Sequence, residues 1–397
     1  MRLNVREWLN NLIFLCFIYL NGSLWAVDGI TGRLQFTLKI ILALFVIILE
    51  RPKIKKKHVK FVLALLAMMM CTIATAGLYF DLDVAAILNL LLALIFVSSY
   101  NEEEFIGYYC NVMRFLAGCS LVGFSLYYIA KEFLMLFPQV VWHAGIRFAN
   151  LFVTLVPLSM NDYFRNWGIF REPGFYAVFL VYALTFELFA KSKMRKRTVY
   201  MEILALLTTF STSGIVALAI LLFAFFMNKK TLDSKDNKKL RRKIIIGTCI
   251  VLGLVASWMM FTYNGQRMFG RIFGKVFSQR ETNMSYINRQ LGIENALEIF
   301  EDHMLFGGGY ISVVGSEIDF TELLWFALYG VLYGIICNLY YLIYPTKYGN
   351  KMIARFLLMC VFFVVGYSQA IESSMMTFVF LLYSFDYGIR KWTSVLH

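Results

Sequence analysis

The chain contains a series of long apolar runs separated by short polar loops, and this pattern limits the folds that it can adopt. A helix needs about 20 mostly apolar residues to cross the hydrocarbon core of a bilayer. Of the 397 residues, 60% are hydrophobic and 16% are charged. The pattern predicts an all-α, polytopic integral membrane protein that forms a single transmembrane domain over residues 1–397. About 12 spans are predicted, near residues 8–26, 34–50, 59–80, 84–99, 107–136, 173–190, 198–212, 214–228, 244–262, 320–344, 353–371 and 373–389.

Basic residues near the ends of the predicted spans set the orientation of the chain, because they stay in the cytoplasm. One set of loops and the two termini carry 26 of the 38 lysines and arginines. This set comprises residues 51–60, 191–197, 229–243 and 347–355 with Arg2, Arg6, Arg390 and Lys391. Both termini are therefore predicted to be cytoplasmic. Such runs are typical of anchors in contact with membrane lipids, whereas nucleic-acid binding would favour aromatic side chains among the charges.

The other basic residues fall on the outer side and are mostly arginine. Nine of these twelve are arginine, against 9 of the 26 in the cytoplasmic set. Orientation does not depend on which cation is used, but bidentate recognition of phosphate favours the planar guanidinium group. The bias indicates an anionic ligand on the outer side.

Two outer segments, 138–172 and 262–319, are longer than the other outer loops. The first has an interrupted apolar stretch that suits an interfacial or re-entrant segment. The second contains apolar residues at helical spacing over 285–303, which predicts an amphipathic helix with Arg289 beside its apolar stripe. Arg267 and Arg271 precede it at four-residue spacing, which places them on one helix face.

The densest group of polar and aromatic residues is Asn161 to Gly174, where the chain enters the sixth predicted span. Pro173 suits the first turn of a helix, so Arg171 and Glu172 are expected at the outward-facing start of that helix. Taken singly, Glu172 is more typical of a helix cap and Arg171 of a lipid-headgroup anchor.

Four stretches in this order resemble the O-antigen polymerase (Wzy) family, a branch of the superfamily that includes the O-antigen ligases. The stretch RNWGIFREPGFYAVFL (165–180) resembles the family signature, and LLTTFSTSGIVALAILL (206–222) resembles its serine-rich break between two short helices. RQLGIENALEIFEDHMLFGGGY (289–310) resembles its outer-loop helix and glycine-rich turn. SEIDFTELLWFALYGVLYG (316–334) resembles its acid-rich entry to the next span.

The resemblance implies a metal-independent glycosyltransferase of GT-C-like architecture with one long periplasmic loop. Such a protein lies in the bacterial inner membrane and joins repeat units at its periplasmic face. Donor and acceptor are both glycans linked to polyprenyl diphosphate, and polyprenyl diphosphate is released. A protein partner that regulates chain length is also implied. No cofactor is expected, because the donor carries its own leaving group and the sequence has no phosphate-binding GxxxxGK[ST] motif.

The reaction defines the roles of the candidate residues. Arginines stabilise the charge on the departing diphosphate, and a carboxylate or histidine takes the proton of the acceptor hydroxyl. The diphosphate candidates are Arg171 and Arg289, followed by Arg267 and Arg271. The candidate bases are Asp319 and Glu317, ranked above Glu172 and His303, although these acids would equally well neutralise the arginines. Tyr163, Trp167 and Tyr310 are candidates for stacking on sugar rings.

Alternatives remain open at this stage. Many ligases have a histidine at the entry to the span after the long loop; Glu317 and Asp319 stand near that entry here, which favours a polymerase over an O-antigen ligase that transfers the glycan to a lipid A core. A flippase for lipid-linked oligosaccharides would place ionisable residues within several spans. Asp81 and Asp83 are similar to a metal-binding DxD motif, but two acids supply few ligands for a hard metal, so they are read as a loop.

Overall fold

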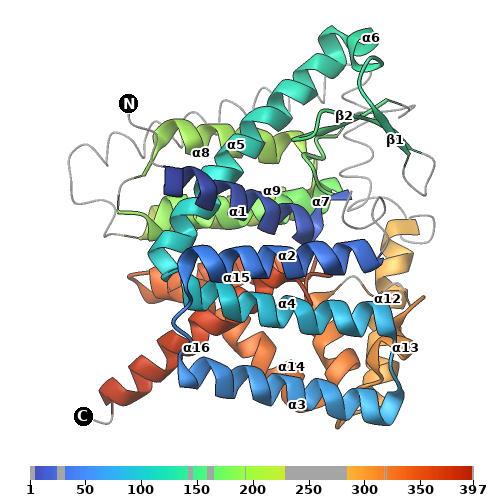
Figure 1. Cartoon of the computed structure of the whole chain (residues 1–397), viewed down its shortest axis with the longest axis vertical. Helices are drawn as coiled ribbons and strands as arrows, with labels where there is room; N and C mark the ends of the chain where they lie inside the picture. Colours follow the sequence, from blue (N-terminus) through green and yellow to red (C-terminus); the bar gives the residue numbers. More distant parts are fainter. Residues whose placement is uncertain are drawn as a thin grey trace. The chain divides into compact units, whose positions relative to one another are not determined.

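The fold is described from a computed structural model in which residues 5–24, 32–141, 146–158, 165–192, 194–228, 284–316, 318 and 320–395 are placed (Figure 1). These residues are mostly helical. The helices before the first strand are α1 (Val5–Gly22), α2 (Gly32–Glu50), α3 (Lys56–Ala76), α4 (Phe80–Ser99), α5 (Glu102–Ile129) and α6 (Lys131–Leu134). The later ones are α7 (Pro173–Thr185), the π-helix η2 (Phe186–Ala190), α8 (Lys196–Thr208), α9 (Thr212–Met227), α12 (Met284–Asp302), α13 (Gly309–Val313), α14 (Thr321–Ile343), the 3-10 helix η5 (Tyr344–Tyr348), α15 (Met352–Gly366) and α16 (Met375–Val395).

Most of the predicted spans coincide with helices in the described residues, but α15 ends at Gly366, before the end of the predicted span at 353–371. Only the predicted span at 244–262 lies outside them. Among the described residues, five helical segments are long and apolar enough to cross a membrane, namely Lys56–Ala76, Phe80–Ser99, Glu102–Ile129, Pro173–Ala190 and Thr321–Tyr348, and α9 and α15 are shorter apolar helices. A multi-pass helical membrane protein follows from these segments. Twelve crossings and a GT-C-like arrangement stay predictions.

The segment 138–172, which was predicted to lie on the outer side, contains a small antiparallel sheet that the all-α prediction did not include. Strands β1 (Gln139–Val141), β2 (Arg147–Asn150) and β3 (Leu155–Pro157) pair in the order β1-β2-β3. Ala149 and Val156 from this sheet pack with Leu134 of α6 in a local hydrophobic core. Strands of three or four residues are too short for their alternation of apolar and polar residues to stand out in a sequence.

The chain divides into two compact units. Two of the boundaries between them fall within helices, one in α5 and one in α15. Unit 1 comprises residues 1–112, 289–347 and 362–397, and unit 2 comprises residues 113–288 and 348–361. In unit 1, α4 packs against α2 and α16, and α14 packs against α3 and α16. In unit 2, α7 packs against α8 and α9.

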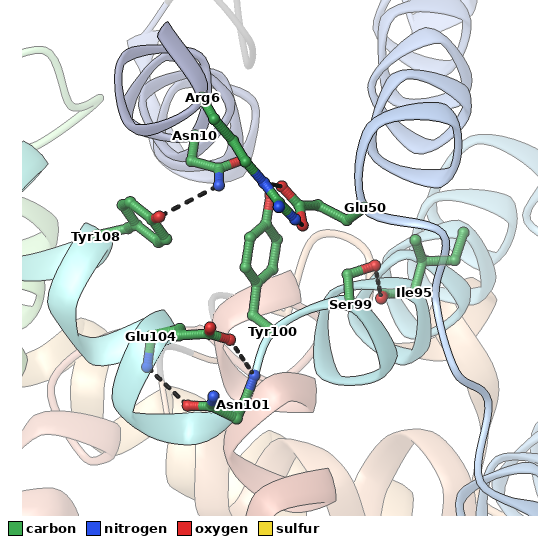
Figure 2. A network of polar contacts seen from close by, with 9 residues as sticks. All are labelled: Arg6, Asn10, Glu50, Ile95, Ser99, Tyr100, Asn101, Glu104 and Tyr108. Atoms are coloured by element: carbon green, nitrogen blue, oxygen red, sulfur yellow. Dashed lines mark hydrogen bonds and ion pairs between the residues drawn. The ribbon is translucent and has the colours of Figure 1, made fainter. Parts of the chain in front are cut away.

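A polar network ties together the helix ends at one end of unit 1 (Figure 2). Arg6 of α1 forms an ion pair with Glu50 of α2 at 2.5 Å. The Tyr100 hydroxyl donates to Asn10 of α1 at 3.0 Å. Glu104 completes a reciprocal cap at the start of α5, since the backbone N–H of Glu104 donates to the Asn101 side chain and that of Asn101 donates to the Glu104 side chain. These bonds hold α1 against the α4–α5 junction.

Helix α14 is broken at Gly330, and its two halves fold back on each other. Gly330 has φ 79° and ψ −176°, which is outside the helical region. The Asn338 side chain donates to the backbone oxygen of Glu322 at 2.9 Å, and the rings of Trp325 and Tyr341 lie 5.7 Å apart. Residues 16 positions apart would be separated by about 24 Å along a straight helix. The prediction of one continuous span over 320–344 is therefore corrected to a folded-back helix.

The segment before α13 fills the break in α14. The backbone N–H of Gly308 donates to the Ala327 oxygen, and that of Val331 donates to the Met304 oxygen. These bonds replace helical bonds that the break removes, as buried backbone groups require. Gly307 and Gly308, in the glycine-rich turn of the resemblance, pack against the α14 backbone, where a β-carbon on Gly307 would lie 2.3 Å from Leu328.

Candidate functional site

In unit 2 the motif at 165–174 lies against the break between α8 and α9. Arg165 Nε donates to the Thr209 oxygen at 2.8 Å, and its Nη2 donates to the Phe210 oxygen at 3.2 Å. The Asn166 side chain donates to the hydroxyls of Ser120 and Thr208 at 3.1 and 2.9 Å. Arg165 thus satisfies backbone oxygens at the end of α8, which have no partners within the helix. The predicted serine-rich break between two short helices is confirmed.

Helices α7 and α9 begin beside each other in this unit. A β-carbon added at Gly214, in the first turn of α9, would lie 2.9 Å from the β-carbon of Ala177 in α7. Only a glycine at position 214 allows this close approach. Ser211 caps α9 through its side chain, which accepts from the Gly214 N–H. Two helix N-termini therefore share one end of unit 2, and their partial positive charges add there.

Arg171 and Glu172 lie at the start of α7, as predicted. The Arg171 guanidinium carbon lies 4.9 Å from the centre of the Phe175 ring, and Nε of this half-buried side chain has no hydrogen-bond partner among the described residues. Glu172 occupies the N-cap position with an extended backbone, but its side chain makes no capping hydrogen bond. The cap interpretation of Glu172 is therefore not supported, and its carboxylate is not committed to the helix.

Trp167 lies in the interior of unit 2. Its side chain is 4% exposed, and its ring packs edge-on against Phe148 of β2 at 4.9 Å. A ring in this position joins the small sheet to the motif at 165–174.

In unit 1, Tyr310 of α13 lies beside a carboxylate that the sequence analysis did not select. The Tyr310 hydroxyl donates to Glu372 Oε1 at 3.4 Å, and the Ser373 hydroxyl donates to the same oxygen at 3.1 Å. Trp325 Nε1 donates to the Glu372 backbone oxygen at 3.2 Å. Tyr310, Trp325 and Glu372 are all buried. This polar cluster joins α13, α14 and the non-helical segment between α15 and α16.

Glu322, at the start of α14, is a second carboxylate that the sequence analysis did not select. Thr321 anchors the same turn, since its hydroxyl donates to the Gln369 oxygen and accepts from the Ile371 N–H. Glu322 is 8% exposed, and neither carboxylate oxygen has a hydrogen-bond partner among the described residues. One of these oxygens occupies the space that a side chain at position 366 would fill, because a β-carbon on Gly366 would lie 2.3 Å from it.

Unit 2 also holds buried acids that the sequence analysis did not select. Glu187 forms an ion pair with Lys191 at 2.5 Å within the turn that includes the π-helix η2. Glu202 of α8 is fully buried, and its carboxylate oxygens have no hydrogen-bond partner in the described part of the chain. A signal was present in the sequence, because an acid inside a predicted span is rare and usually functional or paired.

The remaining predicted residues are divided between the units or fall outside the description. His303 follows α12 in unit 1 and is exposed. Arg289 belongs to α12, whose predicted helix at 285–303 is confirmed; only its backbone is described. Arg267, Arg271, Tyr163, Glu317 and Asp319 lie outside the described residues.

The two aspartates of the DxD-like sequence both lie in the first turn of α4, which corrects the prediction of a loop, and they differ in their surroundings. Asp83 is buried in the first turn of α4 and accepts a hydrogen bond from the Tyr79 N–H at 2.8 Å, whereas Asp81 is exposed. Asp83 acts as a cap for its own helix. Within the described residues, no group of three or more His, Cys, Asp or Glu side chains is placed to hold a metal ion.

The forked contact of Arg165 gives a direct prediction about stability. Arg165→Lys keeps the charge but cannot reach both backbone oxygens with a rigid planar group. We expect the free energy of unfolding to fall by about 1.5–3 kcal/mol, which is the usual contribution of hydrogen bonds to a charged group. Thermal unfolding of the purified protein measures it, and Arg197→Lys, at an exposed position, should leave the midpoint unchanged. Equal midpoints for the two variants would show that Arg165 does not hold the break.

The long apolar helices define the class of the chain, a multi-pass helical membrane protein. Residues 198–330 match the family model described as O-antigen ligase (Wzy_C). The match runs from α8 to the break in α14 and covers about a third of the chain, which confirms the resemblance to the O-antigen ligase and polymerase superfamily over these residues. A comparison with curated proteins gave no match.

Proposed function

We propose that this protein is a polymerase of lipid-linked glycans. It transfers a growing chain from polyprenyl diphosphate onto the sugar of another lipid-linked repeat unit, at the periplasmic face of the bacterial inner membrane. The match at residues 198–330 supports a glycosyltransferase or ligase activity in O-antigen biosynthesis. The polymerase assignment rests on the acid-rich entry to α14, where many ligases have a histidine.

The observation that carries the proposal is the placement of Arg171. Its guanidinium lies at the end of unit 2 where α7 and α9 both begin, and its Nε has no hydrogen-bond partner in the described part of the chain. Two helix N-termini and an arginine favour an anion at one place. A diphosphate leaving group needs this stabilisation most when its bond to the sugar breaks.

The other roles follow from the same chemistry. We propose Arg289, Arg267 and Arg271 as further diphosphate ligands. The acceptor hydroxyl attacks the anomeric carbon, the bond to the diphosphate breaks, and a carboxylate or histidine takes the hydroxyl proton. The candidates for this base are Asp319, Glu317, Glu172 and His303. Tyr163 is the candidate for a sugar contact, whereas Trp167 and Tyr310, the other two predicted residues, are buried inside their units. Donor and acceptor glycans, membrane lipids and a chain-length regulator are the proposed partners.

The deciding experiment incubates the purified protein with a lipid-linked repeat unit in vesicles. A polymerase should produce a ladder of products that differ by one repeat, and a chelator should leave the ladder unchanged. Adding a lipid A core acceptor separates the alternatives. Transfer to that acceptor without a ladder would identify a ligase, and movement of the unit across the vesicle membrane without new bonds would identify a flippase.

A further inference from the structure

The loop between α2 and α3 carries an unusual concentration of positive charge in unit 1. Residues 51–60 include six lysines and arginines. Four of them, Arg51, Lys53, Lys56 and Lys60, are exposed and form no ion pair within the described residues. The helices on both sides are apolar, so the loop lies where the protein leaves the membrane.

The positive charges of the loop lie at the N-terminus of α3, where the helix dipole makes them unfavourable. The N-terminus of a helix carries a partial positive charge, so cations in the first turn are unfavourable there and an anion is favourable. The first turn of α3 contains no acidic residue, and its N-cap residue Lys55 makes no capping hydrogen bond through its side chain. This end of α3 therefore lacks an anion of its own.

Asp386 of α16 supplies one negative charge, but it neutralises only part of the loop. Its carboxylate lies 2.5 Å from Lys57 Nζ, 3.2 Å from Lys55 Nζ and 2.6 Å from Nε2 of the buried His58. The nearest acid in sequence, Glu50, is paired with Arg6. The four exposed cations are left without an acidic partner in the described part of the chain.

An apolar side chain lies among these cations. Ile54 is 53% exposed between Lys53 and Lys55. A basic loop that also presents an apolar residue suits the headgroup region of a bilayer, where cations meet phosphate and apolar groups reach the acyl boundary. An acidic protein surface would match the charges but would not need the exposed isoleucine.

We propose that the α2–α3 loop is a binding site for the phosphate of an anionic phospholipid headgroup, and that the ion pairs of Lys55 and Lys57 with Asp386 keep these two lysines from binding it. If the basic residues served only to keep this loop in the cytoplasm, the loop would need positive charge but no particular pattern of ion pairs. The ion pairs with Asp386 divide the lysines of this loop into two groups. Lys55 and Lys57 are occupied by the carboxylate, whereas Lys53, Lys56 and Lys60 are free to contact a phosphate.

The test uses the purified full-length chain and measures its apparent affinity for phosphatidylglycerol, with phosphatidylcholine as the neutral comparison. Each exposed cation near an anionic surface contributes about fivefold to affinity. Lys53→Gln combined with Lys56→Gln should therefore weaken phosphatidylglycerol binding by about 25-fold at low salt. Added salt should reduce the difference, since these charges are exposed.

The matched control removes two charges from the same loop. Lys55→Gln combined with Lys57→Gln should weaken binding less, because both ammonium groups are paired with the Asp386 carboxylate, whose single charge offsets one of them. Asp386→Asn should act in the opposite direction and tighten binding. Equal losses for the two lysine pairs would overturn the role of Asp386. No loss for either pair, or the same affinity for phosphatidylcholine and phosphatidylglycerol, would overturn the lipid site.

Discussion

Replacing Arg171 with alanine should slow glycan polymerisation by on the order of 100-fold, by analogy with the loss of one donor to a developing negative charge. The guanidinium lies at the shared start of α7 and α9, and its Nε has no hydrogen-bond partner among the described residues, so its removal takes away a cation beside two helix N-termini. The rate of ladder formation with a saturating lipid-linked repeat unit measures the effect. Arg171→Lys should remain a poor substitute, because an ammonium group cannot present a fixed fork of donors.

Two controls separate chemistry from folding in this experiment. Arg197→Ala removes an exposed arginine near the start of α8 and should leave the rate unchanged. Arg289→Ala tests whether a second arginine shares the diphosphate, and we expect a loss similar to that of Arg171→Ala. Wild-type turnover in Arg171→Lys would mean that only charge matters at this position, and wild-type turnover in Arg171→Ala would remove it from the site.

Gly330→Ala should prevent the native folding of unit 1. The backbone conformation at Gly330 (φ 79°, ψ −176°) is accessible almost only to glycine. Forcing another residue into it costs about 1–3 kcal/mol. A β-carbon there would also lie 2.2 Å from the Leu305 oxygen, so the segment that fills the break would have to move. Together these effects should exceed about 4 kcal/mol, which is exceptional for a point substitution. The yield of folded protein and its thermal unfolding midpoint report the result.

Two other glycines separate the contributions to this effect. Gly107→Ala in α5 meets no atom within 4 Å and should be neutral or slightly stabilising, because alanine favours the helix. Gly315→Ala combines a positive φ of 91° with open space, so it should show the backbone cost alone. A Gly330→Ala protein as stable as Gly315→Ala would mean that α14 and the segment at 304–308 are not tightly packed.

The sequence predicted the helices well because long apolar runs have few alternatives in a membrane protein. It also predicted the break between α8 and α9, since serine, threonine and glycine at 211–214 interrupt an apolar stretch at a position suited to a cap. The placement of Arg171 and Glu172 at the start of α7 followed from Pro173. Each of these features depends on residues close together in the chain.

The features that the sequence did not predict depend on contacts between distant residues. The fold-back of α14 leaves hydropathy and periodicity unchanged, and the apolar run indicated it only through its two glycines, Gly330 and Gly334. Glu322 resembled an ordinary acid at a helix start, yet its burial follows from the approach of Gly366 in α15. Glu372 gains its partners from α13 and α14, so its surroundings could not be read from its neighbours in sequence.

The shortness of α8 and α9 has a consequence for the bilayer itself. At 13 and 16 residues they measure roughly 20 and 24 Å, against a hydrocarbon thickness of about 30 Å. For this helical pair to cross, the leaflet beside Ser211 must thin or tilt inward, a mismatch that membranes accommodate at modest cost. Water and lipid phosphates would then lie deeper, at the turn that Arg165 holds, so the diphosphate of the proposed carrier lipid would have a shorter distance to move to reach the start of α7.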